Sequence, residues 1–369
     1  MNLYVERDLL MRGLAKVQGA VSTKSTHPMA AAVLLRAEGD RIVLSATDTE
    51  AALVSEVEAN VHTPGAFAVA HSGFASIIRS LPDPTARILV KDQKMVIESG
   101  KSKYKVSGYS ADDFLPMPSF EIAEGFSVTE RDLLRMVDLA GYAVSTYDVR
   151  LGLNGLHLEM SGPLLRAVGT DGHRLAMCSV PIEGALNIQS DSLVPRRALA
   201  VLRKLLGEAS MDLVRISFAT GAMLVEIDGV LAWFRLVNGQ FPDYGSIIPT
   251  PGLPNAMHVP RAELVAALKR IEAVHDPLRP MVIRISDSAI EAITSSHATG
   301  KELSEEISIS HREGKADEIG FSPALLAESV GKVSETTVLI EFANALAPVR
   351  VVGLGGEGSD CIVMPMQMA

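Results

Sequence analysis

The stretch Val5-Glu-Arg-Asp-Leu-Leu10 decides the fold, because it recurs as Val128-Thr-Glu-Arg-Asp-Leu-Leu134, which starts 123 residues later. The same tetrapeptide, Ala-Val-Ser-Thr, follows both copies, at residues 20–23 and 143–146. A third copy occupies residues 259–271. In all three, apolar residues recur at the spacing of an amphipathic helix. Self-similarity of this kind predicts a threefold repeat of one structural unit.

A second family of helical segments follows the first in each repeat, at residues 70–81, 194–205 and 321–332. Pro195 and Pro323 suit the first helical turn, where a missing N–H costs nothing. Elsewhere the apolar spacing changes to a period of two, which predicts strands. The predicted strands lie near residues 41–46, 94–98, 104–106, 156–159, 214–218, 223–227, 282–286 and 349–352. We therefore expect an α+β fold, in which each repeat packs two helices on antiparallel strands.

Proline-rich stretches separate the repeats. They occupy residues 114–119, 241–244 and 248–254. Proline disfavours both helix interiors and central strands, so these stretches read as linkers. The division predicts three domains, at residues 1–119, 120–250 and 251–369.

The composition excludes several classes of protein. Of the 369 residues, 47% are hydrophobic and 21% are charged, as in globular proteins. Only Cys178 and Cys361 occur, so we expect neither a disulfide framework nor a structural zinc site. The N-terminus lacks the pattern of a signal peptide, and no apolar run is long enough to span a membrane. We expect a soluble, cytoplasmic protein.

The net charge of -10 argues, taken alone, against a nucleic-acid partner. The charge is unevenly distributed, however. The six predicted helical segments hold 14 Lys and Arg against 8 Asp and Glu, so the rest of the chain is strongly acidic. Residues 195–206 are the most basic segment. Either these are ordinary solvated helix faces, or together they form a surface that meets phosphates.

Three longer motifs identify a family. They are Val168-Gly-Thr-Asp-Gly-His-Arg-Leu-Ala176, Phe234-Arg-Leu-Val-Asn-Gly-Gln-Phe-Pro-Asp-Tyr244 and Met364-Pro-Met-Gln-Met368. Ala46-Thr-Asp-Thr-Glu50 and the region of Pro28 add weaker support. With the threefold repeat, these motifs resemble the beta sliding clamp, the beta subunit of bacterial DNA polymerase III. The resemblance spans the whole chain.

The resemblance implies a head-to-tail homodimer of three-domain subunits that closes into a ring around double-stranded DNA. Such a ring is a processivity factor, which slides without reading sequence and is associated with the nucleoid. It tethers the polymerase III alpha subunit, the clamp loader and repair proteins through clamp-binding motifs. We expect no catalytic residues, no cofactor and no metal ion, because members of the family are accessory subunits of the polymerase.

The resemblance also implies a peptide pocket between the second and third domains. Its lining residues would be Leu153, Thr170, Gly172, His173, Arg174, Leu175, Pro242, Ile247, Leu346, Pro348, Ile362, Met364, Pro365 and Met366. Methionines repack around different partners and suit such a surface. Without the family, Met364 and Met366 would be read as a C-terminal core strand.

Two further sets of residues follow from the ring. The DNA-facing candidates are Lys24, Arg150, Arg196, Arg197, Arg203 and Lys204, and the alternative for each is a solvated surface charge. The candidates for the interface between the first domain and the partner's third domain are Phe74, Ile78, Tyr104, Val106, Ile271 and Val274. Their alternative role is ordinary domain core.

The chain departs from the family pattern beside the predicted pocket. Gln367 stands where a basic residue is common, and Gly245 and Ser246 stand where arginines are common. Leu151-Gly152 replaces an aromatic pair of some members. We therefore expect a less basic and wider pocket, with an altered motif preference, and a divergent second clamp is also possible.

Enzyme alternatives are weaker. Gly353-Leu-Gly-Gly-Glu-Gly358 matches a dinucleotide-binding pattern, but only eleven residues follow it, too few for the required helix and acidic residue. Gly100-Lys-Ser102 lacks the first glycine of a phosphate loop. Asp171 and His173 could serve acid–base chemistry, but no partnered motif accompanies them. A rival from another class is a scaffold that binds only proteins, which would be indifferent to DNA topology.

Overall fold

The computed structural model describes residues 1–368 apart from 23, 121–124, 162, 184–191, 208–209, 297–299 and 357. The described chain forms two compact units. Unit 1 is built from residues 1–134, 182–189 and 197–236, and unit 2 from residues 135–181, 190–196 and 237–369.

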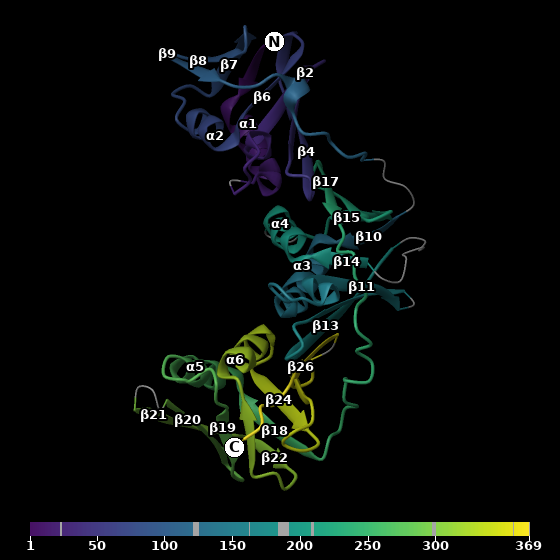
Figure 1. Ribbon diagram of the computed structural model, residues 1–369, viewed down its shortest axis with the longest axis vertical. Coiled ribbons are helices and arrows are strands. Elements are labelled where there is room, and N and C mark those ends of the chain that lie inside the picture. The colour runs from purple at the N-terminus through teal and green to yellow at the C-terminus, as the bar shows by residue number, and fades with distance from the viewer. Residues whose placement is uncertain are drawn as a thin grey trace. The chain divides into compact units, whose positions relative to one another are not determined.

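Unit 1 contains two antiparallel sheets, of five strands in the order β5-β1-β7-β8-β9 and of eight strands in the order β10-β15-β16-β17-β4-β3-β2-β6. The first sheet consists of β1 (Asn2–Glu6), β5 (Asn60–Thr63), β7 (Thr85–Lys91), β8 (Lys94–Ser99) and β9 (Ser102–Ser107). The second consists of β2 (Ala32–Glu38), β3 (Arg41–Thr47), β4 (Ala51–Glu58), β6 (Gly65–Ala70), β10 (Gly125–Thr129), β15 (Leu213–Ala219), β16 (Ala222–Ile227) and β17 (Val230–Arg235). Helices α1 (Arg7–Val17) and α2 (His71–Arg79) lie side by side against these strands (Figure 1).

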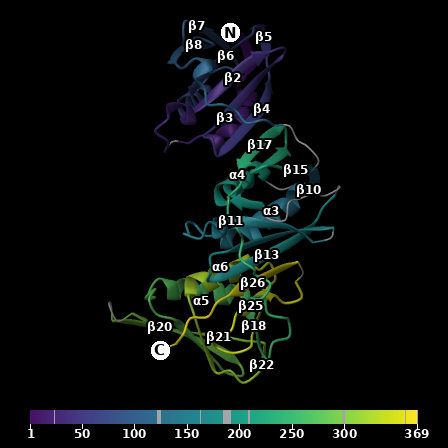
Figure 2. The same ribbon diagram turned by 45° about the vertical axis from the view of Figure 1, so that its right-hand side comes forward.

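Unit 2 repeats the pattern with a nine-stranded sheet, β14-β11-β12-β13-β26-β25-β24-β18-β22, and a four-stranded sheet, β21-β20-β19-β23. The larger sheet consists of β11 (Gly155–Ser161), β12 (Leu164–Thr170), β13 (Arg174–Pro181), β14 (Ser192–Pro195), β18 (Asn255–Pro260), β22 (His311–Glu313), β24 (Thr337–Phe342), β25 (Val349–Gly353) and β26 (Ser359–Val363). The smaller consists of β19 (Met281–Ile285), β20 (Ala289–Ser296), β21 (Lys301–Ser308) and β23 (Glu318–Phe321). Helices α5 (Arg261–Glu272) and α6 (Pro323–Lys332) pack against each other (Figure 2).

The remaining helices are α3 (Glu130–Leu139) and α4 (Arg196–Leu206), whose residues divide between the two units. Short 3₁₀ segments lie at η1 (Gln18–Ala20), η2 (Pro28–Ala31), η3 (Ala111–Asp113), η4 (Gly141–Ala143) and η5 (Leu151–Asn154). The described chain thus holds the six helices that the sequence predicts, two in each repeat, and the predicted α+β class is confirmed.

The strand order repeats three times. The sheet β6-β2-β3-β4 has the same order as β14-β11-β12-β13 and β23-β19-β20-β21, and β1-β7-β8-β9 matches β10-β15-β16-β17 and β18-β24-β25-β26. Where two repeats meet, equivalent strands join in antiparallel pairs. Strand β4 pairs with β17, and β13 pairs with β26. The junctions between repeats are therefore continuous hydrogen-bonded sheets.

The helical repeat of the sequence marks the buried helix face. In α1, the buried residues are Leu10, Gly13, Leu14 and Val17. In α5, Leu264, Ala267, Leu268 and Ile271 are buried at the same spacing. This i, i+3, i+4, i+7 pattern places one stripe of each helix on a sheet.

An Asp-Gly pair forms one of the hairpin turns. Asp228 and Gly229 connect β16 to β17 with φ of 44° and 69°. Two consecutive left-handed residues match the twist of an antiparallel pair, which is why Asp-Gly is favoured there.

Gly13 lets α1 approach its sheet closely, because a Cβ at this position would collide with Val57 and would lie 2.8 Å from Leu44 Cδ1. We expect Gly13→Ala to destabilise the protein by about 1–3 kcal/mol through overpacking, measured by urea unfolding. Gly73, in α2, has no atom within 4 Å of the corresponding position. Gly73→Ala is the matched control and should be neutral or stabilising by up to ~1 kcal/mol. Equal effects of the two substitutions would contradict this account.

Candidate functional site

The turn at residues 170–174 joins β12 to β13 and is held by its own side chains. Thr170 Oγ1 accepts a hydrogen bond from Gly172 N at 3.1 Å and donates one to Arg174 O at 2.6 Å. Asp171 Oδ1 accepts from the backbone N–H groups of His173 and Arg174, at 2.9 and 3.0 Å. Gly172 has a φ of 87°, which favours glycine. The turn is therefore preformed, with Gly172 and His173 exposed at its tip.

Arg174 supports this turn from beneath. Its guanidinium lies 3.1 Å from Asp171 Oδ2 and 2.7 Å from Glu328 Oε2, and it donates to Tyr142 O at 3.2 Å. Its Cζ also lies 4.9 Å from the centre of the Tyr142 ring. Only 8% of the residue is exposed. Arg174 thus fixes the turn to α6 and offers little surface of its own, and its lining of the pocket stays a prediction.

The C-terminal segment lies beside the turn. Leu175 and Ile362, which are opposite each other across β13 and β26, are both buried. Strand β26 ends at Val363, and Met364 N then donates to His173 O at 2.8 Å. The following Pro365 and Met366 are half-buried and in no strand. The alternative of a C-terminal core strand is therefore wrong for these residues, which form a tail: Met364 bonds to the turn, and Met366 N donates to Gly320 O, on β23, at 2.9 Å.

The segment of residues 241–247 contributes a third side. Phe241 belongs to one hydrophobic cluster with Leu175 and Ile362, and Tyr244 packs against that cluster. Pro242 and Ile247, on the same segment, are exposed. We call the turn 170–174, the tail 364–366 and the segment 241–247 the candidate peptide surface.

The other predicted lining residues lie as follows. Pro348 precedes Val349, whose strand partner is Val363, so Pro348 is placed at the same strand ends as the tail. Leu346 is 65% exposed, whereas Leu153 is buried. The positions where the chain departs from the family, Leu151, Gly245, Ser246 and Gln367, are all exposed, while Gly152 is buried.

Arg150 lies against the turn and is paired. Its guanidinium makes two hydrogen bonds to Asp148, at 3.0 and 2.9 Å. A Cβ added at Gly172 would lie 3.0 Å from Arg150 Nη2. The side-chain and backbone hydrogen bonds from Arg150 lower the pKa of Asp148 to about 2. Arg150, predicted to face DNA, is thus placed at the edge of the candidate peptide surface.

The predicted DNA-facing residues on α4, and Lys24 outside it, differ in their surroundings. Arg196 donates to Val144 O at 2.8 Å, and Arg197 forms an ion pair with Asp48. Lys24 and Lys204 are exposed. Arg203 also has an interaction partner. The cations of α4 therefore do not form one uniform patch.

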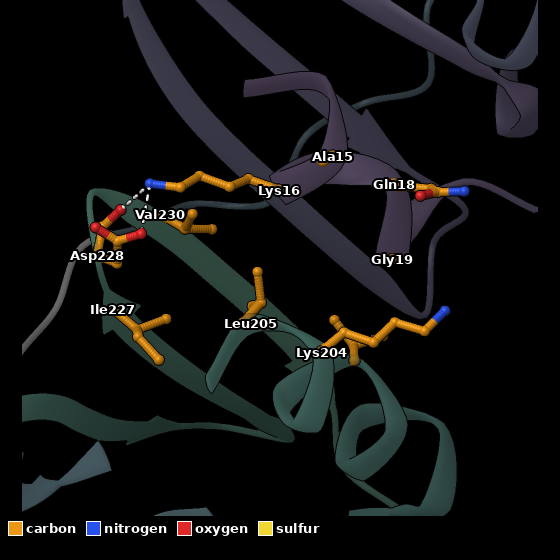
Figure 3. Close-up of a pocket in the computed structure, with 10 residues that line it drawn as sticks. Ala15, Lys16, Gln18, Gly19, Lys204, Leu205, Ile227, Asp228 and Val230 are labelled. Atoms are coloured by element: carbon orange, nitrogen blue, oxygen red, sulfur yellow. Dashed lines mark hydrogen bonds and ion pairs between the residues drawn. The ribbon is translucent and has the colours of Figure 1, made fainter. Parts of the chain in front are cut away.

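Lys204 lines a cavity of about 150 Å³ between the end of α1, the last turn of α4 and the β16–β17 hairpin. At one end of this cavity Lys16 Nζ lies 2.7 Å from Asp228 Oδ2, and Lys204 extends on the other side (Figure 3). The ion pair between Lys16 and Asp228 connects the first helix of one repeat to a hairpin of the next. The sequence did not single out this contact, because 212 residues separate its partners.

The predicted interface residues separate into two groups. Phe74, Ile78 and Ile271 have no exposed surface, so the prediction that they contact a partner is corrected: they are core residues of their own chain. Tyr104, Val106 and Val274 are half-buried and keep surface that a partner could cover.

The described residues contain no group of three or more His, Cys, Asp or Glu that could hold a metal ion. Among the same residues, no helix is long and apolar enough to cross a membrane. Gly353 ends β25, Ser359 begins β26 and Glu357 lies outside the described residues, so the glycine-rich stretch connects two strands of a sheet. Gly100 likewise lies between β8 and β9.

Three α+β repeats joined through continuous sheets, with an exposed turn and methionine tail where the last two meet, define the class of clamp-fold proteins. Family models agree, matching the DNA polymerase III beta subunit N-terminal domain at residues 1–118, its central domain at 127–243 and its C-terminal domain at 246–367. The chain belongs to the DNA polymerase III beta subunit family, the beta sliding clamps.

Individual relatives cover the whole chain. The beta sliding clamp of Pseudomonas aeruginosa is 30% identical over 374 residues, and that of Caulobacter vibrioides is 29% identical over 381 residues, with full coverage of both chains in each case. A solved sliding clamp of Pseudomonas aeruginosa, bound to griselimycin, matches with a TM-score of 0.92 at 29% identity and 100% coverage of each chain.

The pairing of Arg150 with Asp148 predicts a pH dependence. A carboxyl pKa held below its ordinary value of 3.8 stabilises the fold above that pH, and the contribution is lost as the pH falls toward about 2. In Arg150→Met the pKa of Asp148 should return toward 3.8, which carbon NMR of labelled aspartate can follow. Arg284→Met, which removes a different surface ion pair, should leave it unchanged. An Asp148 pKa near 3.8 in the unmodified protein would refute the pairing.

Proposed function

We propose that two copies of this chain close head to tail into a ring around double-stranded DNA. The ring acts as a processivity factor in the cytoplasm, at the nucleoid. It performs no catalysis and tethers the polymerase III alpha subunit, the clamp loader and repair proteins through the candidate peptide surface. The three domains of the repeat, at residues 1–119, 120–250 and 251–369, would each contribute one pair of helices to the DNA-facing side.

The proposal rests on two strand edges that have no partner strand in the described chain, although their equivalents in the other repeats are paired. Strand β4 pairs with β17, and its equivalent β13 pairs with β26, the equivalent of β17. The third equivalents are β21 and β9, which end their sheets in the described chain. In a dimer, β21 of each copy can pair with β9 of the other. The same junction then forms twice, and both edges of each copy are paired. A head-to-tail contact that closes in this way generates a ring.

The two edges are chemically complementary. On β9, Tyr104 and Val106 lie on the core-facing side and Lys103 and Lys105 on the exposed side. On β21, Leu303 and Ile307 lie on the core-facing side together with Glu305, which pairs with Arg270, and Glu302 and Glu306 are exposed on the other side. Pairing would therefore place apolar side chains against apolar ones, and lysines against glutamates. Opposite charges across an antiparallel pair stabilise it, and like charges destabilise it.

Contact with DNA in such a ring is electrostatic. The six helices hold 14 Lys and Arg against 7 Asp and Glu, although the whole chain carries a net charge of -10. Cations attract phosphates without reading bases, so they permit sliding. Of the predicted DNA-facing residues, all except the half-buried Arg197 are exposed. Topological enclosure, more than affinity, would hold the ring on DNA.

The candidate peptide surface suits short apolar motifs. Its tail supplies Met364 and Met366, whose flexible side chains adapt to different partners. The griselimycin complex of the Pseudomonas relative supports a ligand-binding role for this family. Gly245, Ser246 and Gln367 are exposed and uncharged, so these three positions add no positive charge to this surface. We infer that partner motifs bind here mainly through apolar anchors.

The strand-edge model predicts a charge-swap result. Lys103→Glu combined with Lys105→Glu should raise the dimer Kd at least tenfold, and so should Glu302→Lys combined with Glu306→Lys, because each variant opposes like charges. A mixture of the two variants should recover a dimer, since both of its interfaces pair opposite charges. Analytical ultracentrifugation measures the association. Lys91→Glu with Lys94→Glu, at the β7–β8 hairpin, is the control.

The same samples test the ring on DNA. After loading by a bacterial clamp loader, the unmodified protein should stay on a nicked circle and leave once the circle is linearised. Neither of the two charge-reversed variants alone should be retained on the nicked circle, whereas their mixture should be retained. Retention that ignores linearisation would support a protein scaffold with ordinary DNA affinity, and failure of the mixture to dimerise would exclude the β9–β21 junction.

The peptide surface is tested with griselimycin as the probe. Met364→Ala removes an anchor contact worth about 2 kcal/mol at a binding hot spot, so Kd should rise by roughly 30-fold in calorimetry. Met211→Ala is the control, because Met211 is a 62% exposed methionine of unit 1. Unchanged affinity of the Met364 variant would remove the tail from the binding surface.

A further inference from the structure

His157 is a buried histidine beneath the candidate peptide surface. It lies on β11 and is 4% exposed. Its ring stacks on Phe241, with ring centres 4.7 Å apart and an angle of 9° between the planes. Phe241 belongs to the same cluster as Leu175 and Ile362, at the base of that surface. A polar ring therefore supports the segment that carries Pro242 and Ile247.

The polar contacts of His157 are one-sided. Its Nε2 lies 3.4 Å from Glu159 Oε2, while its Nδ1 is buried and has no partner among the described residues. An unpaired polar atom in a protein interior lowers stability. Phenylalanine or leucine would fill the same space without that cost, so packing alone does not explain a histidine here.

Glu159 connects His157 to the segment from a second direction. The carboxylate accepts a hydrogen bond from the Tyr244 hydroxyl and another from Arg166 Nη1, at 3.1 Å. Burial and the hydrogen bond to Glu159 raise the pKa of Tyr244, so its hydroxyl keeps its proton and acts as the donor. Tyr244 thus ties the segment to Glu159, and His157, whose Nε2 lies beside the same carboxylate, holds the segment through its stack on Phe241.

The segment has few other attachments. Residues 236–254 include no strand or helix. Val237 N donates to Leu193 O at 2.9 Å, and Ile247 N donates to Tyr244 O at 3.0 Å. The backbone at Gly152 packs directly on that of Gln240. Between Gln240 and Ile247, the aromatic stack and the Tyr244 hydroxyl are therefore the main restraints on Pro242.

We propose that His157, Glu159 and Tyr244 form a positioning cluster that fixes residues 241–247 and thereby sets the affinity of the candidate peptide surface for its ligands. The inference rests on the proposed function, because it assigns these residues to peptide binding. None of the three needs to touch the ligand. A segment that is already ordered binds more tightly than a mobile one, because no conformational entropy has to be lost when the ligand binds.

The test replaces the hydroxyl alone. Tyr244→Phe keeps the ring and removes the bond to Glu159. We expect a rise in the Kd for griselimycin of about fivefold to tenfold, as loss of one charged hydrogen bond allows. Amide exchange at Gly245 and Ile247 should become faster in the same variant. Thr294→Val is the control, because it removes another buried hydroxyl of unit 2, one that bonds to His275. It should change neither quantity.

A double-mutant comparison separates positioning from general stability. Glu159→Ala should reproduce the Tyr244→Phe effect, whereas Glu159→Gln keeps an acceptor oxygen and should recover part of the affinity. Combining Tyr244→Phe with Glu159→Ala should cost no more than the larger single change, because both act through one contact. If Tyr244→Phe lowers the melting temperature too far for binding studies, the comparison of Glu159→Gln with Glu159→Ala carries the test.

The outcomes are distinguishable. If the unmodified protein fails to bind griselimycin, the proposed peptide surface is wrong, whatever the variants do. If it binds and the Tyr244 and Glu159 variants bind equally well, the positioning role is overturned. Faster exchange at residues 241–247 with unchanged affinity would also overturn it, since the segment would then lie outside the binding surface.

Discussion

Antiparallel pairing between strands of consecutive repeats is the constraint on which this structure depends. The β4–β17 and β13–β26 pairs carry sheets without interruption from one repeat to the next. Each pair also satisfies backbone groups that an exposed edge would leave open. The β13–β26 pair has a second consequence, because it sets Leu175 opposite Ile362 and brings the 170–174 turn beside the C-terminal tail.

The candidate peptide surface is therefore a by-product of a junction between repeats. Its turn is held by Thr170 and Asp171, and Arg174 secures that turn to α6 through Glu328. The exposed His173 at the tip and the half-buried methionines of the tail stand on this rigid base. A binding surface built this way can keep its shape while its flexible side chains adapt to different ligands.

The charges of this protein are unevenly distributed between its helices and the rest of the chain. The chain is acidic overall, yet its helices carry twice as many cations as anions. Some of these cations are engaged within the chain, as Arg197 is by Asp48 and Lys16 by Asp228. Exposed lysines on β9 and exposed glutamates on β21 are arranged by strand alternation, so their signs can be matched between copies.

The sequence by itself determined the threefold repeat, the helix positions and eight of the strands of the described chain, because helical and strand periodicities are local and recur at nearly constant intervals. Its motifs also located the 170–174 turn and the methionine tail. Only the tertiary structure decided which residues keep a surface. Phe74 and Ile78 were assigned to a subunit interface but are buried, and the bond between Glu159 and Tyr244 joins positions 85 residues apart. Burial and such contacts depend on strand pairing between distant segments, which local spacing does not encode.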